Sequence, residues 1–112
     1  DNYIKKNKNI TKIKIKKNMN NEQYFNFIFS DLASKGINNL LIESGAKLNT
    51  ILLSLNLVDE LLIFRSGYII GNDGIPFIND LGLKEIEQLK KYKVSSLSFF
   101  EDDILEKRHL SI

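Results

Sequence analysis

Residues 40–64 read LLIESGAKLNTILLSLNLVDELLIF, and the fold follows from the order of patterns within them. A short apolar run ends at Glu43, and Ser44-Gly45 then makes a turn. Apolar residues recur at helical spacing over 46–55, and a second apolar run follows at 61–70. A strand, a tight turn, a helix and a second strand are typical of an α/β protein, so this class is predicted for the chain.

Working outward from this unit, strands and helices continue to alternate. Asn20 or Asn21 can cap a helix that ends at Gly36, and Asn56 can end the helix over 46–55 in the left-handed conformation. The sheet is expected to be mixed and mainly parallel, with right-handed crossovers and a C-terminal antiparallel hairpin. The predicted strands are residues 11–16, 39–43, 61–70, 92–100 and 104–111, with a short helix over 83–90.

Composition excludes several classes of site. The chain has 112 residues, which predicts a single domain over 1–112. It has no Cys, so disulfides and thiolate metal sites are excluded, and its one histidine, His109, excludes a multi-histidine metal site. No metal is therefore expected. No apolar stretch reaches the ~20 residues of a membrane span and no signal peptide is evident, so a cytoplasmic protein without membrane partners is expected.

Charge is concentrated at the start of the chain. Seven lysines and one aspartate give residues 1–17 a net charge of +6, which leaves −4 for the remainder of a chain whose total is +2. Such an arm can bind nucleic acid. Here, however, Lys alternates with Ile in TKIKIKK, which favours a half-buried strand with a solvated face, and only Tyr3 is available for stacking on bases. No nucleic-acid partner is expected.

The turn at Ser44-Gly45 is the first candidate for chemistry. The first N–H groups of the following helix lack partners and lie at the positive end of its dipole, so they can bind phosphate. Gly45 carries no Cβ that would block a close approach. Glu43 precedes the turn, where a carboxylate can accept hydrogen bonds from sugar hydroxyls. An ordinary strand–helix turn and a carboxylate favoured by the dipole are the alternatives.

Other motifs favour structural roles. Asp59 and Glu60 are adjacent, and neighbouring residues of a strand point to opposite faces, so joint acid–base work is disfavoured. Gly71-Asn72-Asp73-Gly74 can be a loop that needs positive φ or a second backbone approach to a dinucleotide. His109 has no evident catalytic partner.

Over residues 36–78 the chain resembles a known family. Ile42-Glu43-Ser44-Gly45, Leu57-Val58-Asp59-Glu60 and the glycines of the following loop are similar to motifs of the reductase domain of bacterial riboflavin biosynthesis, found in the bifunctional deaminase/reductase. The match departs from the family pattern at Ser44, where Gly is usual, and at Ser66-Gly67, where Ala-Pro is usual.

The resemblance implies a dihydrofolate-reductase-like fold and NADPH as the hydride donor. It implies reduction of 5-amino-6-(5-phosphoribosylamino)uracil at the ribose C1 to the ribitylamino product. By the same resemblance, Ser44, Gly45 and Ala46 would lie against the cofactor pyrophosphate, and Glu43 near the substrate ribose. It also implies a homodimer. No catalytic residue can be carried over.

The family's reductase domain is longer than this chain, and its N-terminal substrate motifs have no counterpart here. The chain is therefore expected to be the C-terminal portion of a reductase domain within a longer enzyme, inactive on its own. Two alternatives stay open: a non-catalytic dihydrofolate-reductase-like remnant or interaction module, and a related pteridine-type reductase.

Overall fold

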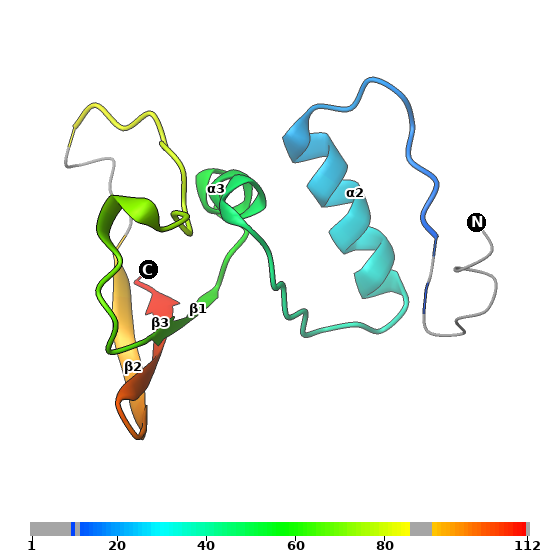
Figure 1. The fold of residues 1–112 in the computed structure, drawn as a ribbon. Helices are drawn as coiled ribbons and strands as arrows, with labels where there is room; N and C mark the ends of the chain where they lie inside the picture. The colour runs from blue at the N-terminus through cyan, green and yellow to red at the C-terminus, as the bar shows by residue number, and fades with distance from the viewer. Residues whose placement is uncertain (1–9, 11, 86–90, 112) are drawn as a thin grey trace. The chain divides into compact units, whose positions relative to one another are not determined.

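The structure is a computed structural model that describes residues 10, 12–85 and 91–111. The chain divides into two units, residues 1–42 and 43–112, and each is considered separately below. Figure 1 shows the elements along the chain. They are α2 (Asn21–Ser34), α3 (Ala46–Ser54), β1 (Glu60–Arg65), the 3-10 turn η1 (Gly71–Asp73), β2 (Tyr92–Phe100) and β3 (Asp103–Leu110). The single domain predicted from length stays a prediction.

Helix α2, in the first unit, begins and ends at the predicted residues. Asn20 accepts a hydrogen bond from the backbone N–H of Gln23 at 2.8 Å, and the Gln23 side chain accepts one from the Asn20 N–H at 3.2 Å. This reciprocal pair satisfies two N–H groups at the helix start. Gly36 follows the helix with φ of +80°, and the Ile37 N–H reaches back to the Leu32 carbonyl at 3.1 Å. Both predicted boundaries are confirmed.

The strands predicted over 11–16 and 39–43 do not form among the described residues. Residues 12–16 and 37–45 lie outside any strand or helix. A strand exists only where another segment satisfies its backbone hydrogen bonds, and neither segment has such a neighbour in the part of the chain that the structure describes. Leu40 and Leu41 are consequently 50% and 70% exposed. The mainly parallel sheet was therefore a wrong prediction for the described strands.

The second unit begins with α3, which ends at Asn56 as predicted. Asn56 has φ of +61°, and the Leu57 N–H bonds to the Leu52 carbonyl at 3.0 Å. Leu52, on the predicted apolar stripe, is only 2% exposed and is the buried hydrophobic residue of the described chain. The stripe therefore directs the helix toward the interior of this unit.

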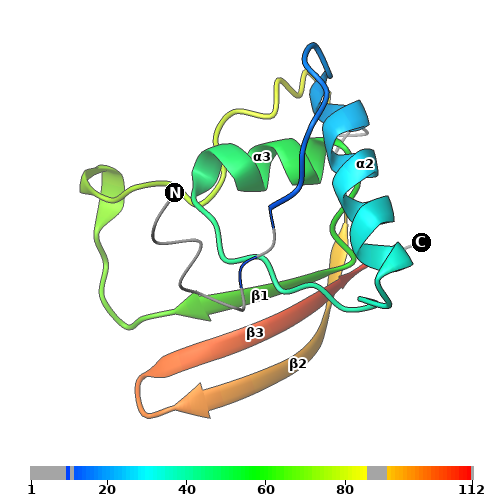
Figure 2. The same cartoon turned by 90° about the vertical axis from the view of Figure 1, so that its right-hand side faces the viewer.

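All strand pairs described in the second unit are antiparallel. The order is β1-β3-β2, with β3 in the centre, as Figure 2 shows. The predicted C-terminal hairpin of β2 and β3 is confirmed, with a turn at Glu101-Asp102 and an irregularity between Val94 and Ser96. β1 ends at Arg65 rather than at residue 70. Arg65 pairs with Ile104, and β3 begins one residue earlier, at Asp103. The ladder therefore ends close to Arg65.

A buried carboxylate lies at the centre of this sheet. Glu106 of β3 is 5% exposed and forms ion pairs with Arg65 of β1, at 2.9 Å, and with Arg108 two residues along β3. Burial alone would raise the pKa of Glu106. The hydrogen bonds from Arg108 and Arg65 outweigh it and hold that pKa below its ordinary value. The ionised carboxylate therefore ties β1 to β3.

Apolar side chains remain exposed on both faces of the sheet. Strand register puts Leu62 and Phe64 on one face and Leu97 and Phe99 on the other. Their exposed fractions are 48%, 73%, 52% and 70%. The sheet therefore presents exposed apolar side chains on both faces among the described residues. The predicted helix over 83–90 lies largely outside them, since residues 86–90 are not described.

We predict that Glu106→Gln lowers the thermal unfolding midpoint near pH 7, because it leaves Arg65 and Arg108 facing a neutral amide. The folded-state pKa of Glu106 is lowered from about 4.5, so its contribution is present above that value and is lost as the pH falls through the folded-state pKa. The difference between variant and wild type should therefore shrink in acid. Midpoints measured by circular dichroism across pH 3 to 7 test this.

Glu60→Gln is the matched control. Glu60 pairs with Lys107 at 2.9 Å, but both side chains are well exposed, at 53% and 40%, so little change is expected. A Glu106→Gln deficit that stays constant with pH would contradict the assignment of the lowered pKa.

Candidate functional site

The candidate site is the turn at which residues 43–45 enter α3. Gly45 is the N-cap, in extended conformation with φ of −85°, and no side chain caps the helix. Among the described residues, the backbone N–H groups of Ala46, Lys47 and Leu48 have no partner, since the first intrahelical bond runs from Asn49 to the Gly45 carbonyl at 3.1 Å. The first turn also holds no acidic residue. The helix start can therefore accept an anion.

Gly45 is not required by the local backbone or by packing. Its φ is one that any residue adopts, and a Cβ at this position would have no described atom within 4 Å. Open space beside three unpartnered N–H groups leaves room for a ligand to approach the backbone. Gly45 thus fits the predicted phosphate cradle, which the structure does not otherwise test.

Glu43 lies directly before the turn. It is exposed, and its carboxylate makes no hydrogen bond or ion pair within the described residues. The predicted strand does not form here, so Glu43 ends an extended segment rather than a strand. Its carboxylate can accept a ligand's hydroxyl groups beside the helix start. The structure places Glu43, Ser44, Gly45 and Ala46 next to one another, as the sequence requires, and leaves their binding roles as predictions.

Two polar side chains of α3, which the sequence analysis did not identify, connect the turn to a distant loop. Asn49 donates to the Ser44 carbonyl at 3.3 Å and to the Phe77 carbonyl at 2.9 Å, and it accepts from the Ser44 hydroxyl. Thr50 accepts from the Asn79 N–H at 2.8 Å. The only signal in the sequence was two polar residues between apolar ones in a helix. That signal does not reveal partners 28 and 29 residues away.

The glycine loop takes the predicted form. Gly71 has φ of +67°, which favours glycine, and Gly71–Asp73 form a 3-10 turn closed by the Gly74 N–H on the Gly71 carbonyl at 3.3 Å. An open depression of about 440 Å³ lies along residues 70–76. Within the described residues, no hydrogen bond joins Gly71–Gly74 to the Ser44–Ala46 turn. A second backbone approach to a dinucleotide stays a prediction.

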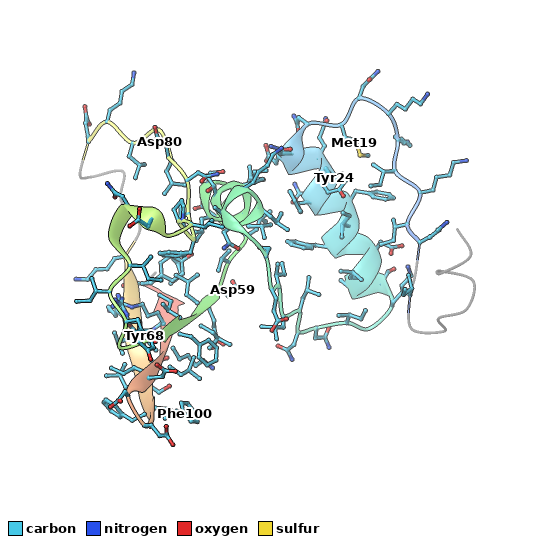
Figure 3. All side chains as sticks on the ribbon, in the orientation of Figure 1. Met19, Tyr24, Asp59, Tyr68, Asp80 and Phe100 are labelled. Carbon is cyan, nitrogen blue, oxygen red and sulfur yellow. The ribbon has the colours of Figure 1, made fainter. Side chains whose placement is uncertain are left out.

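Asp59 and Glu60 have structural partners. The Asp59 carbonyl accepts from the Leu110 N–H at 3.0 Å, and Glu60 pairs with Lys107. In Figure 3 Asp59 lies between α3 and β1. Tyr92 donates its hydroxyl to the Val58 carbonyl at 2.9 Å, and burial, followed by the nearby Asp59 charge, raises the pKa of Tyr92. These contacts hold the sheet to the end of α3, as the structural interpretation predicted.

Among the residues that the structure describes, no group of three His, Asp or Glu side chains could hold a metal ion. None of the described helices is long and apolar enough to cross a membrane.

The chain is similar to known proteins over most of its length. The family model of the RibD C-terminal domain matches residues 5–104. The riboflavin biosynthesis protein RibD of Buchnera aphidicola subsp. Baizongia pistaciae (strain Bp) is 36% identical over 69 residues, which cover 59% of this chain and 18% of that protein. The chain thus spans less than a fifth of the length of this curated relative.

Solved structures agree with this match. Form 1 of Acinetobacter baumannii RibD superposes with a TM-score of 0.69 at 20% identity, covering 77% of this chain and 24% of that one. A protein of Shewanella sp. PV-4 assigned to riboflavin biosynthesis superposes with a TM-score of 0.63 at 25% identity, covering 77% of this chain and 45% of that one. These likenesses confirm the predicted dihydrofolate-reductase-like α/β fold.

We predict that Gly45→Asp folds normally and gains a few tenths of a kcal/mol in unfolding free energy, because Asp caps a helix better than Gly and the space is open. Gly71→Ala is the control. Its Cβ also meets no described atom, but φ of +67° should cost about 1 kcal/mol. Urea unfolding compares the two. A loss above about 1 kcal/mol for Gly45→Asp would show that Gly45 is structurally required.

Proposed function

The chain belongs to the RibD C-terminal domain family, and from this premise we propose that it is the C-terminal part of an NADPH-dependent reductase of riboflavin biosynthesis. The substrate of the proposed reaction is the phosphoribosylamino-pyrimidine of that pathway, reduced at its ribose C1. The family match supports reductase chemistry in general terms. The cofactor and the substrate are our proposal.

The observation that carries the proposal is the uncapped start of α3. Three unpartnered N–H groups, a glycine with open space beside it and no acidic residue in the first turn suit the two negative charges of a pyrophosphate. An N-cap side chain or an acidic residue would normally stabilise such a helix end. Their absence is explained if an anionic cofactor takes that place.

In this proposal the cofactor pyrophosphate lies against the turn of Ser44, Gly45 and Ala46 and is held by the open backbone N–H groups at the start of α3, and the Lys47 side chain adds positive charge at the same helix end. Glu43 accepts hydrogen bonds from the ribose hydroxyls of the substrate and orients the C1 carbon. NADPH, when bound, supplies the hydride. The protein contributes orientation and electrostatics.

The remaining substrate contacts are assigned in this proposal to parts of the enzyme outside this chain. The chain spans 18% of the curated relative and 24% of the Acinetobacter RibD chain. The exposed apolar side chains on both faces of the sheet support this assignment, because such surfaces are normally covered in a finished domain.

We predict that the complete gene product binds NADPH and that Gly45→Asp weakens binding at least about tenfold, because a carboxylate would face the pyrophosphate at short range. Quenching or energy transfer from protein to NADPH fluorescence measures the dissociation constants. Ser54→Asp is the control, since it adds the same charge at the other end of α3 and should bind like the wild type.

Two results would contradict the proposal. A wild type that does not bind NADPH would favour the non-catalytic alternative. Equal binding by the wild type and Gly45→Asp would show that the turn is not the cradle.

We also predict that Glu43→Gln lowers kcat/KM for the phosphoribosylamino-pyrimidine by about ten- to a hundredfold, because hydrogen bonds to a charged group contribute about 1.5–3 kcal/mol. KM for NADPH should stay unchanged, and Glu60→Gln should match the wild type. Steady-state kinetics of the complete gene product tests this. If Glu43→Gln instead raises the KM for NADPH, Glu43 contacts the cofactor and not the substrate.

A further inference from the structure

Both polar atoms of the Asn49 side chain make hydrogen bonds. A carboxamide has two N–H donors and one carbonyl acceptor. Both donors are used, one on the Ser44 carbonyl at 3.3 Å and one on the Phe77 carbonyl at 2.9 Å, and the acceptor takes the Ser44 hydroxyl. Asn49 itself is half-buried. One side chain thus holds both the hydroxyl and the backbone carbonyl of Ser44, the first residue of the proposed cradle.

These bonds set the orientation of the Ser44–Gly45 peptide. The peptide is trans, and in a trans peptide the C=O and N–H bonds point in opposite directions. Asn49 holds the Ser44 carbonyl toward the helix, so the Gly45 N–H points away from Asn49. That N–H has no partner among the described residues. Asn49 therefore determines where a donor of the helix entrance is directed.

The arrangement replaces a common apolar contact with hydrogen bonds. Ser44 and Asn49 occupy the positions before the N-cap and four residues into the helix, where two apolar side chains often meet and fix the entry angle of the chain. The Ser44 hydroxyl has one hydrogen, which it donates to Asn49. It cannot also donate to a phosphate, so recognition there falls to the backbone N–H groups.

We propose that Asn49 is a positioning residue for the cofactor: through the Ser44 carbonyl it sets the direction of the Gly45 backbone N–H, one of the donors that hold the NADPH pyrophosphate. This inference rests on the proposed function of the Ser44–Ala46 turn. In this inference Asn49 acts through the Ser44–Gly45 peptide and not by contact with the reacting atoms. Its effect is confined to cofactor binding.

A separate contact allows this role to be distinguished from support of the loop. Thr50 holds the same loop through the Asn79 N–H at 2.8 Å, and its hydroxyl also donates to the Ala46 carbonyl, but it does not contact Ser44. Thr50→Val therefore loosens the loop while the Ser44–Gly45 peptide keeps its partners. If loop support were all that mattered, Thr50→Val and Asn49→Ala would have the same effect.

The test is the dissociation constant for NADPH, measured by fluorescence on the complete gene product, together with steady-state kinetics, for Asn49→Ala, Ser44→Ala, Thr50→Val and Gly45→Asp; the dissociation constant should change in parallel with the KM for NADPH. Asn49→Ala should raise the KM for NADPH about tenfold with kcat nearly unchanged, the result expected when binding common to ground and transition states is lost. Ser44→Ala should raise it less, because only the hydroxyl contact is lost. Thr50→Val should leave this KM unchanged. A purely structural role would lower kcat through loss of folded enzyme.

The outcomes separate the inference from the function on which it rests. Suppose that Gly45→Asp impairs NADPH use. If Asn49→Ala then leaves the KM for NADPH unchanged, or if Thr50→Val raises that KM as much as Asn49→Ala does, the inference is overturned and the proposed function stands. If the wild type does not use NADPH, both fall. If Asn49→Ala fails to fold, Ser44→Ala decides: a raised KM for NADPH supports the inference, and an unchanged one overturns it.

Discussion

Backbone hydrogen bonding sets the extent of every strand in this structure. β3 has a partner on each side and is the element to which both other strands are attached. β1 and β3 run antiparallel, so the last residue of β1, Arg65, pairs with Ile104 near the first residue of β3. The ladder between them therefore ends at Arg65. Residues 39–43 have the apolar composition of a strand, yet they form none among the described residues. Composition makes a strand possible, but a neighbouring backbone is needed to form it.

The sequence predicted best those features that depend on near neighbours. Asn20, Gly36 and Asn56 lie at helix ends for reasons contained within a few residues, and the C-terminal hairpin needs only two adjacent strands and a turn. The predicted parallel pairing is not found among the described strands, because the strands expected over 11–16 and 39–43 do not form there and the pairs that do form are antiparallel. The family resemblance, by contrast, correctly identified the overall fold.

At the candidate site, too, the features that depend on neighbouring residues were predicted and those that depend on distant residues were not. The turn at Ser44-Gly45 was found from its local pattern, and its open N-terminal N–H groups are in the predicted place. The contact of Asn49 with Phe77 was missed because it joins residues 28 positions apart in the chain. The pairing of Glu106 with Arg65 was missed for the same reason, since it spans 41 residues. Long-range polar contacts leave little trace in a single sequence.

The central position of the last strand has a consequence for the order in which the chain can fold. During synthesis β1 leaves the ribosome well before β3, and domains fold as their segments become available. β1 cannot pair until β3 has been synthesised, and its exposed Leu62 and Phe64 remain without a sheet during that interval. The β2–β3 hairpin is local and forms on the microsecond scale, so it is the surface on which β1 then docks. Synthesis of β3 is therefore the event that commits this unit to its sheet.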